Sequence, residues 1–277
     1  MKNRRYKYIV LMAMTAVLWS LGGVLIKNVH WNASAIAGMR SIFALPILLV
    51  IVRRKDITLS KVQIAGAICY CATLTCYVQA MVLTTAANAV LLQYSAPIYV
   101  ALLGGWLLKE KVNKFDWMII FITIGGMILF FLDDLSTSNI WGNLLGILSG
   151  VFFAAMFIFM RMQKDASPIG SVFLGNILVG LVNLPFMFES MPDGQSWICL
   201  AVLGIVQIGL AYAIYSYAIK HVTALEAVMI TMLEPVLGPV WVAIFTPEIP
   251  GPWAMVGGTI VIIAIGIRSI RKARTLN

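Results

Sequence analysis

Long apolar runs recur along the whole chain, and only a few polar residues separate one run from the next. A helix that crosses the hydrocarbon core of a bilayer, about 30 Å thick, needs roughly 20 apolar residues. The runs alternate too weakly between apolar and polar positions to form the strands of an outer-membrane barrel. The pattern predicts an all-α integral membrane protein with ten transmembrane helices, at residues 8–26, 33–52, 62–83, 85–107, 115–132, 142–161, 169–188, 197–218, 224–245 and 252–270.

The composition supports this prediction. Of the 277 residues, 61% are hydrophobic and 11% are charged, whereas a soluble domain has about 25% charged residues. So few charges cannot cover a soluble globule of this size, which argues against a soluble enzyme or a nucleic-acid-binding domain. The ten spans leave no room between them for a separate soluble domain, so the function must lie inside the helix bundle.

The basic residues indicate the orientation of the predicted helices. Short cytoplasmic loops carry an excess of Lys and Arg, and every basic residue except Lys27 and Arg40 lies near a chain end or in a loop after an even-numbered span. Both termini are therefore expected to be cytoplasmic, and the net charge of +9 reflects topology rather than nucleic-acid binding. The opposite loops carry acidic residues at Asp133, Asp134, Glu189, Asp193 and Glu248.

The second half of the sequence repeats the first at an offset of 138 residues. Each half contains five predicted spans, an odd number, so the second half must enter the membrane from the opposite side. This divides the chain into residues 1–135 (spans one to five) and residues 136–277 (spans six to ten). Inverted repeats can exchange conformations around a site at the membrane midplane, which favours transport over a duplicated scaffold. The matched pairs include Tyr77 with Tyr215, Ala80 with Ala218, Ala86 with Ala224, Ala89 with Ala227, and Pro97 with Pro235.

The order of these residues resembles the two repeats of EamA-type transporters in the drug/metabolite transporter superfamily. This sequence departs from the family pattern at the proline-rich end of span nine and in the lack of an Arg in span seven that corresponds to Arg40. The resemblance in the first repeat is carried by Tyr77, Ala80, Thr85-Ala86-Ala87, Pro97 and Trp106-Leu107-Leu108-Lys109-Glu110, and in the second by Tyr215, Ala218, Thr223-Ala224, Glu234-Pro235 and Glu248.

The resemblance implies a multi-pass protein of the plasma (inner) membrane with a substrate cavity at the centre of the bundle. It implies a secondary transporter, often an exporter, of small metabolites such as amino acids or amines, which moves its cargo by alternating access. The family also includes sugar-phosphate and nucleotide-sugar carriers, so the cargo itself stays open. Two alternatives also stay open: a carrier of lipids or lipid-linked molecules, and a membrane scaffold that transports nothing.

Two ionisable residues are predicted inside spans, where they are costly and mark functional sites by default. Glu234 lies about 15 Å into span nine, and Arg40 lies about 10–12 Å into span two, at 1.5 Å per residue. At these depths both can face one cavity, where Glu234 would bind a proton or a cationic group and Arg40 a carboxylate. The alternative is a static buried ion pair that joins the two helices.

Other polar and aromatic residues in the spans complete the candidate substrate-binding or coupling site. Amide side chains can bind cargo or bridge neighbouring helices. Aromatic rings can stack on a cationic or apolar cargo or serve only packing and interface anchoring. The residues expected to contribute are Gln93, Gln207, Trp19, Tyr77, Tyr94, Tyr99 and Tyr215.

Two prolines occupy equivalent places in spans four and nine. Pro97 and Pro235 should each break a helix, because proline removes a backbone hydrogen bond and clashes with the preceding turn. Interrupted helices at matching positions of two halves point to the site of a transporter, although kinked packing is the alternative.

The sequence shows no phosphate-binding loop and no zinc-binding histidine pair. His30 and His221 lie in loops, and the four Cys residues lie in spans as small core residues. We therefore expect no enzyme activity, no cofactor and no metal. The expected partners are a small-molecule substrate, a coupled proton or cation and the lipid bilayer, but no nucleic acid, with the chain acting as a monomer or homodimer.

Overall fold

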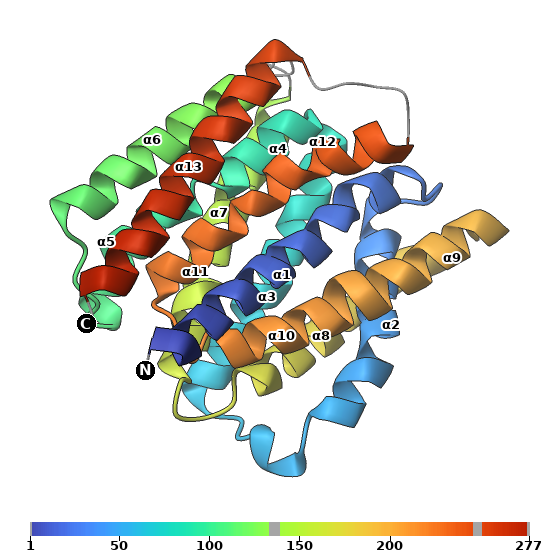
Figure 1. The fold of residues 1–277 in the computed structure, drawn as a ribbon. Coiled ribbons are helices and arrows are strands. Elements are labelled where there is room, and N and C mark those ends of the chain that lie inside the picture. Colours follow the sequence, from blue (N-terminus) through green and yellow to red (C-terminus); the bar gives the residue numbers. More distant parts are fainter. Residues whose placement is uncertain (1, 133–138, 246–250, 276–277) are drawn as a thin grey trace.

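The computed structural model describes residues 2–132, 139–245 and 251–275, with side chains at 6–26, 28–132, 139–238, 240–241 and 251–272. All regular secondary structure in these ranges is helical. Figure 1 shows one bundle of long helices, with both marked chain ends on the same side of it. Glu248 and the pair Asp133 and Asp134, all expected in acidic loops, lie outside the described residues.

Several helices in the first half of the chain start at residues whose side chains cap the helix. The Asn32 side chain accepts the Ala35 N–H at the start of α2, and Asn113 and Asp116 form a reciprocal capping box at the start of α6. These caps fix where each helix starts after a short loop. The elements are α1 (Lys2–Lys27), α2 (Ala33–Ile51), the 3₁₀ turn η1 (Arg54–Asp56), α3 (Lys61–Leu83), α4 (Ala86–Gln93), α5 (Ala96–Leu107) and α6 (Lys114–Phe130).

The second half follows the same plan, with one irregular helix. Residues Leu203–Leu210 form a π-helical segment, η3, between two α-helices. Such wide turns are rare and occur often at functional sites. The elements are α7 (Ile140–Met162), α8 (Pro168–Asn183), η2 (Leu184–Phe188), α9 (Gly194–Val202), η3, α10 (Ala211–Ala218), α11 (Ala224–Thr231), α12 (Leu233–Phe245) and α13 (Pro252–Thr275).

Eight stretches of helix among the described residues are long and apolar enough to cross a membrane. The 17-residue helix α6 and the broken pair α11 and α12 are not among the eight. The count of ten spans therefore stays a prediction for these two segments, as does the cytoplasmic placement of the termini. The eight are Tyr6–Ile26, Ala33–Ile51, Lys61–Leu83, Ala86–Leu107, Ile140–Met162, Pro168–Phe188, Gly194–Ala218 and Pro252–Lys272.

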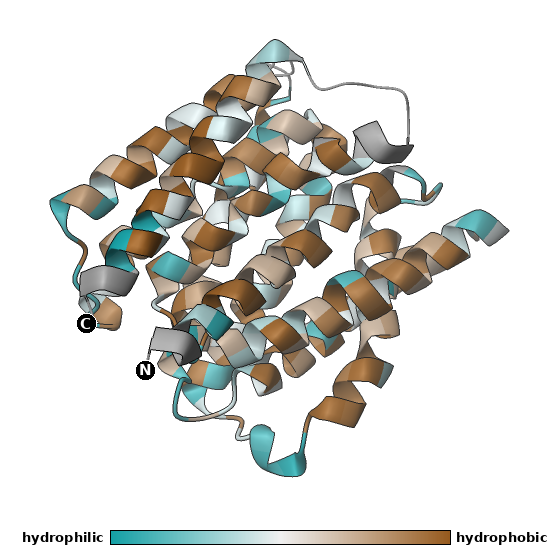
Figure 2. Ribbon diagram, viewed as in Figure 1, coloured by the Kyte–Doolittle hydropathy of each residue, from teal (hydrophilic) through white to brown (hydrophobic). Residues whose placement is uncertain are grey.

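The outside of the bundle is apolar along the helices and polar at their ends, as Figure 2 shows by colour. Large apolar side chains such as Val50, Trp106 and Phe188 are exposed there. A soluble monomer rarely exposes apolar surface so extensively. This surface fits contact with lipid and a multi-pass membrane protein.

Small residues allow two helices, α6 and α13, to cross closely. Where α6 packs on α13, a Cβ added to Gly257 would overlap the carbonyl oxygen of Gly126 and the backbone of Phe130. Without a hydrophobic force between helices in lipid, such close approach of backbones supplies packing energy.

Two helix breaks lie at equivalent positions of the two halves. In the first half α4 ends at Gln93 and α5 begins at Ala96, and in the second α11 ends at Thr231 and α12 begins at Leu233. Pro97 and Pro235 each lie in the first turn of the new helix, where a missing N–H leaves no intrahelical bond unmade. The breaks therefore fall just before the prolines.

Candidate functional site

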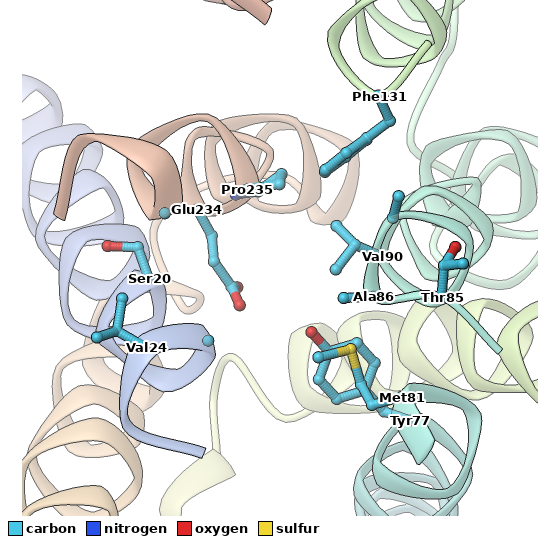
Figure 3. Close-up of a pocket in the computed structure, with 13 residues that line it drawn as sticks. Ser20, Val24, Tyr77, Met81, Thr85, Ala86, Val90, Phe131, Glu234 and Pro235 are labelled. Carbon is cyan, nitrogen blue, oxygen red and sulfur yellow. The ribbon is translucent and has the colours of Figure 1, made fainter. Parts of the chain in front are cut away.

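A cavity of about 430 Å³, here called the wide chamber, lies between the two halves. Its lining is mainly apolar and comes from α1, α3, α4, α12 and Phe131, the residue that follows α6. Figure 3 shows Glu234 of α12 on one side and Val90 and Ala86 of α4 on the other, with Met81 and Tyr77 of α3 along the lower edge of the cavity. Its size falls in the range of about 300–1,000 Å³ typical of ligand sites.

A smaller space of about 40 Å³, here called the polar pocket, shares Gly23, Tyr77 and Glu234 with the wide chamber. Unlike the chamber, it is rich in polar and aromatic side chains. A space of this size holds only a few water-sized groups. The pocket adds Trp19, Arg40, Gln93, Gln207 and Tyr212 to the lining.

Arg40 is the main unsatisfied group of the polar pocket. The side chain is 2% exposed, and its Nε and Nη2 atoms have no hydrogen-bond partner within the described part of the chain. The indole Nε1 of Trp19, which lines the same pocket, is also buried without a partner there. Buried polar groups are nearly always hydrogen-bonded. The arrangement can accept an anion such as a carboxylate.

Glu234 supplies a carboxyl group to the same cavity. The Tyr94 hydroxyl donates a hydrogen bond of 2.5 Å to Oε2 of Glu234. Within the described residues no ion pair joins Glu234 to Arg40, although both line the polar pocket. Figure 3 shows the Glu234 carboxylate and the Tyr77 hydroxyl directed into the cavity. A carboxyl group and a guanidinium group thus line one space without a direct ion pair between them.

The helix breaks position this pair. Tyr94 follows the last residue of α4, and Glu234 is the second residue of α12, so each lies at the break of its own half. A broken helix presents side chains and free backbone groups at membrane depth only where they face a cavity or other protein. The Tyr94–Glu234 hydrogen bond therefore joins the two halves at the cavity.

The predicted amides also line the polar pocket, and both make contacts between helices. Gln93 donates to Oγ of Ser149 at 3.0 Å, and Gln207, on the π-helical segment η3, donates to the carbonyl of Trp19 at 3.4 Å. Oε1 of Gln207 is buried without a partner among the described atoms. Each amide therefore bridges helices while it faces the pocket.

The remaining predicted residues fall into three groups. Tyr77 and Pro235 line the wide chamber. Tyr215 packs against Trp19 behind the polar pocket, with ring centroids 5.7 Å apart. Pro97 and Tyr99 lie on α5 outside the lining of both spaces. The structure thus brings most of the predicted residues together and leaves these two apart.

Sequence reasoning missed several lining residues. Gly23 follows Trp19 by one helical turn on α1, and Thr73 precedes Tyr77 by one turn on α3. Residues four apart lie on the same face of a helix. The four-residue spacing from Trp19 and Tyr77 is therefore the sequence signal that identifies Gly23 and Thr73 as lining residues.

An ion-pair network lies at the end of the bundle that carries the chain termini. Nε of Arg161 lies 3.0 Å from Oε1 of Glu110, and Nη1 of Arg161 donates to the carbonyls of Ile219 and Lys220. Oε2 of Glu110 accepts the N–H of Ala224 at 2.9 Å. The network ties α7 and the segment after α5 to the start of α11.

The packing of the broken helices differs between the two ends. Beside the ion-pair network α5 packs on α11, whereas α4 and α12 show no comparable packing among the described residues. The wide chamber lies between α4 and α12. The broken helices of the two halves therefore pack together beside the ion-pair network and leave the wide chamber between them farther along the bundle.

At the opposite end of the bundle, the loop after α1 is tied to the start of α9. Nδ1 of His30 lies 3.1 Å from Oδ2 of Asp193, and the His30 N–H donates to Oγ of Ser196 at 2.9 Å. The backbone N–H of Ser196 and the His30 side chain lower the pKa of Asp193 to about 2, because both stabilise the carboxylate.

A multi-pass helical bundle with an internal duplication and buried charges in a central cavity has the architecture of a membrane transporter. The chain belongs to the EamA-like transporter family, whose profile matches it twice, at residues 6–132 and 140–270. It is therefore a transporter of that family, acting on a small molecule in a membrane setting. The family indicates a transporter rather than an enzyme.

Individual relatives agree with the family. An uncharacterized transporter of Archaeoglobus fulgidus is 27% identical over 80% of this chain and 81% of its own length. The pseudopaline exporter CntI of Pseudomonas aeruginosa is 21% identical over 92% of this chain and 93% of its own length. A protein of known crystal structure superposes with a TM-score of 0.84 over 96% of this chain and 98% of the other, at 14% identity. That likeness shows the shared fold.

Proposed function

We propose that this chain is a secondary transporter that exports small metabolites bearing a carboxylate or an ammonium group, such as amino acids or amines. The observation that carries the proposal is the pair Arg40 and Glu234, which line one buried pocket without a direct ion pair between them. Arg40 binds the carboxylate of the cargo, and Glu234 binds its ammonium group or a coupled proton or cation. That a relative is named an exporter supports the direction.

The proposed topology has ten spans in two inverted repeats, residues 1–135 and 136–277, with both termini cytoplasmic in the plasma (inner) membrane. Basic residues near the chain ends and after even-numbered spans support this orientation. In this orientation the Arg161–Glu110 network is cytoplasmic, and the wide chamber opens outward.

Alternating access follows from the repeat. The offset of 138 residues makes α4 the equivalent of α11, and α5 the equivalent of α12. If the two repeats exchange conformations, α4 packs on α12 and α5 separates from α11. The same cavity then opens to the cytoplasm, as expected for inverted repeats around one central site.

Ligand-induced stabilisation of the purified protein tests the proposed cargo class. A ligand that binds only the folded state raises the melting temperature by mass action. The panel contains amino acids, amines without a carboxylate, carboxylates without an amine, and phospholipids. Amino acids should stabilise the wild type. Arg40→Gln should lose the response to carboxylates and keep that to amines, whereas Glu234→Gln should do the reverse.

Glu189→Gln, at an exposed position on a loop, is the matched control and should respond like the wild type. A response to phospholipids alone would support a lipid carrier instead. Cooperative melting with no response to any member of the panel would support a scaffold. Either result would overturn the proposal.

A further inference from the structure

Gly23 lies where the two parts of the cavity meet, because it lines both the wide chamber and the polar pocket. It is part of the long helix α1, and no glycine in the described chain has a positive φ. The backbone at this position would therefore accept any L-residue. Glycine inside a helix lowers helix stability relative to alanine, so its presence needs another reason.

Helix packing does not supply that reason. No described atom lies within 4 Å of a Cβ built on Gly23. The neighbouring Gly22 differs, because its Cβ would lie 2.7 Å from Nε2 of Gln207. A side chain at position 22 would therefore displace the Gln207 amide, whereas at Gly23 the missing side chain leaves free space in the cavity.

The volumes and linings of the two spaces limit which cargo can extend past Gly23. The polar pocket, with a volume of about 40 Å³, fits a charged group the size of a carboxylate or an amino group. The wide chamber, with about 430 Å³, is lined by apolar side chains that include Val24, Met81 and Phe131. A cargo with its charged group at Arg40 would extend past Gly23 and place the rest of its structure in the chamber.

We propose that Gly23 is a specificity-determining residue, whose lack of a side chain admits cargo in which a bulky apolar group is attached next to the charged group. This rests on the proposed function, and it adds the size and polarity of the cargo. A side chain at position 23 would narrow the junction, so small zwitterions would still bind while those with a ring or a branched chain would be rejected.

Gly125 on α6 offers a matched control. No described atom lies within 4 Å of a Cβ built there either, and Gly125 lines neither part of the cavity. The same change, Gly→Val, therefore adds the same side chain to a helix at both positions, but it enters the cavity only at position 23.

The experiment uses proteoliposomes that contain the wild type, Gly23→Ala, Gly23→Val or Gly125→Val. It measures how strongly alanine, leucine, phenylalanine and tryptophan each inhibit uptake of a labelled cargo. Gly23→Val should weaken competition by phenylalanine and tryptophan on the order of tenfold or more relative to alanine, since pockets discriminate at this scale. Gly23→Ala should show a smaller shift in the same direction and a raised melting temperature. Gly125→Val should keep the wild-type ratios.

Two results would overturn the role of Gly23 and leave the proposed function intact. In the first, competition weakens equally for small and large amino acids in both Gly23 variants. In the second, the ratio of competition by large and small amino acids stays at the wild-type value in both variants. A wild type that transports amines or carboxylates but none of the four amino acids would overturn this inference alone. A wild type that transports no amino acid, amine or carboxylate would overturn the proposed function and this inference with it. Gly23→Ala keeps the test valid if Gly23→Val does not fold.

Discussion

The hydroxyl of Tyr94 donates a hydrogen bond to the carboxylate of Glu234, a residue 140 positions later in the chain. Each residue lies at the helix break of its own repeat, so one hydrogen bond joins the two breaks at the cavity. It orients Glu234 toward the space that also contains Arg40. The acidic group of the site is thus held by one repeat and supplied by the other.

Removing this hydrogen bond should weaken cargo binding. Tyr94→Phe keeps the ring that packs edge-on against Phe153 but loses the donor to Glu234. Hydrogen bonds to charged groups contribute about 1.5–3 kcal/mol, so cargo affinity should fall about tenfold or more. Tyr99→Phe, on α5 outside the cavity lining, should change affinity little. Equal affinities of the two variants in a thermal-shift titration would contradict a positioning role for Tyr94.

Loss of the ion-pair network should open the cavity toward the chain termini. Arg161→Ala removes the contacts to Glu110 and to the carbonyls before α11. The readout is labelling of a cysteine placed at Thr73, in a variant lacking the four native cysteines, by an impermeant thiol reagent added on the side of the termini. Labelling should increase in Arg161→Ala and stay closer to the starting level in Arg161→Lys, which keeps a cation and a donor at this position. Labelling that does not change would refute the closing role.

The close crossing of α6 and α13 should not tolerate a larger residue. Gly257→Val would force its side chain into the backbone of Phe130, and overpacking of this kind costs about 1–3 kcal/mol. Gly266→Val on the same helix meets no described atom within 4 Å of its Cβ. The melting temperature should fall clearly in the first variant and little in the second. A similar fall in both would show that helix propensity rather than the crossing is responsible.

His221 should make stability decrease as the solution becomes acidic. Its ring stacks on Tyr8 with centroids 3.8 Å apart, and burial together with Lys220, Arg161 and Lys7 lowers its pKa. The unfolded chain then binds more protons below about pH 6.5, so stability is full above that pH and is lost as pH falls. The melting temperature of His221→Phe should decline less than that of the wild type between pH 7 and 5.5. Parallel declines would contradict this assignment.

Part of this architecture follows directly from sequence patterns. Apolar runs locate the helices, because crossing a bilayer requires a continuous apolar surface of fixed length. The depths of Arg40 and Glu234 follow from the constant rise of a helix, and both residues line one cavity in the structure. Matched prolines indicate where helices break, since their chemistry forbids a continuous hydrogen-bond ladder.

Other features depend on which helices meet, and one-dimensional patterns do not contain that information. The Tyr94–Glu234 bond and the Arg161–Glu110 network each join distant segments. The π-helical turns around Gln207 have no local signal that sets them apart from an ordinary apolar helix. Gly23 differs from Gly22 only through its surroundings, because a Cβ at Gly22 would meet Gln207 whereas one at Gly23 would meet free space between the two parts of the cavity.

Counterflow most directly tests whether the cavity that contains Arg40 and Glu234 carries the cargo. The cargo is one identified by ligand-induced stabilisation, and counterflow is measured in proteoliposomes that contain wild type, Arg40→Gln, Glu234→Gln or the control Glu189→Gln. We expect exchange by the wild type and the control, with loss on the order of tenfold or more in each cavity variant, because each loses a contact to the cargo. Exchange that continues at the wild-type rate in both Arg40→Gln and Glu234→Gln would contradict the claim that this cavity carries the cargo.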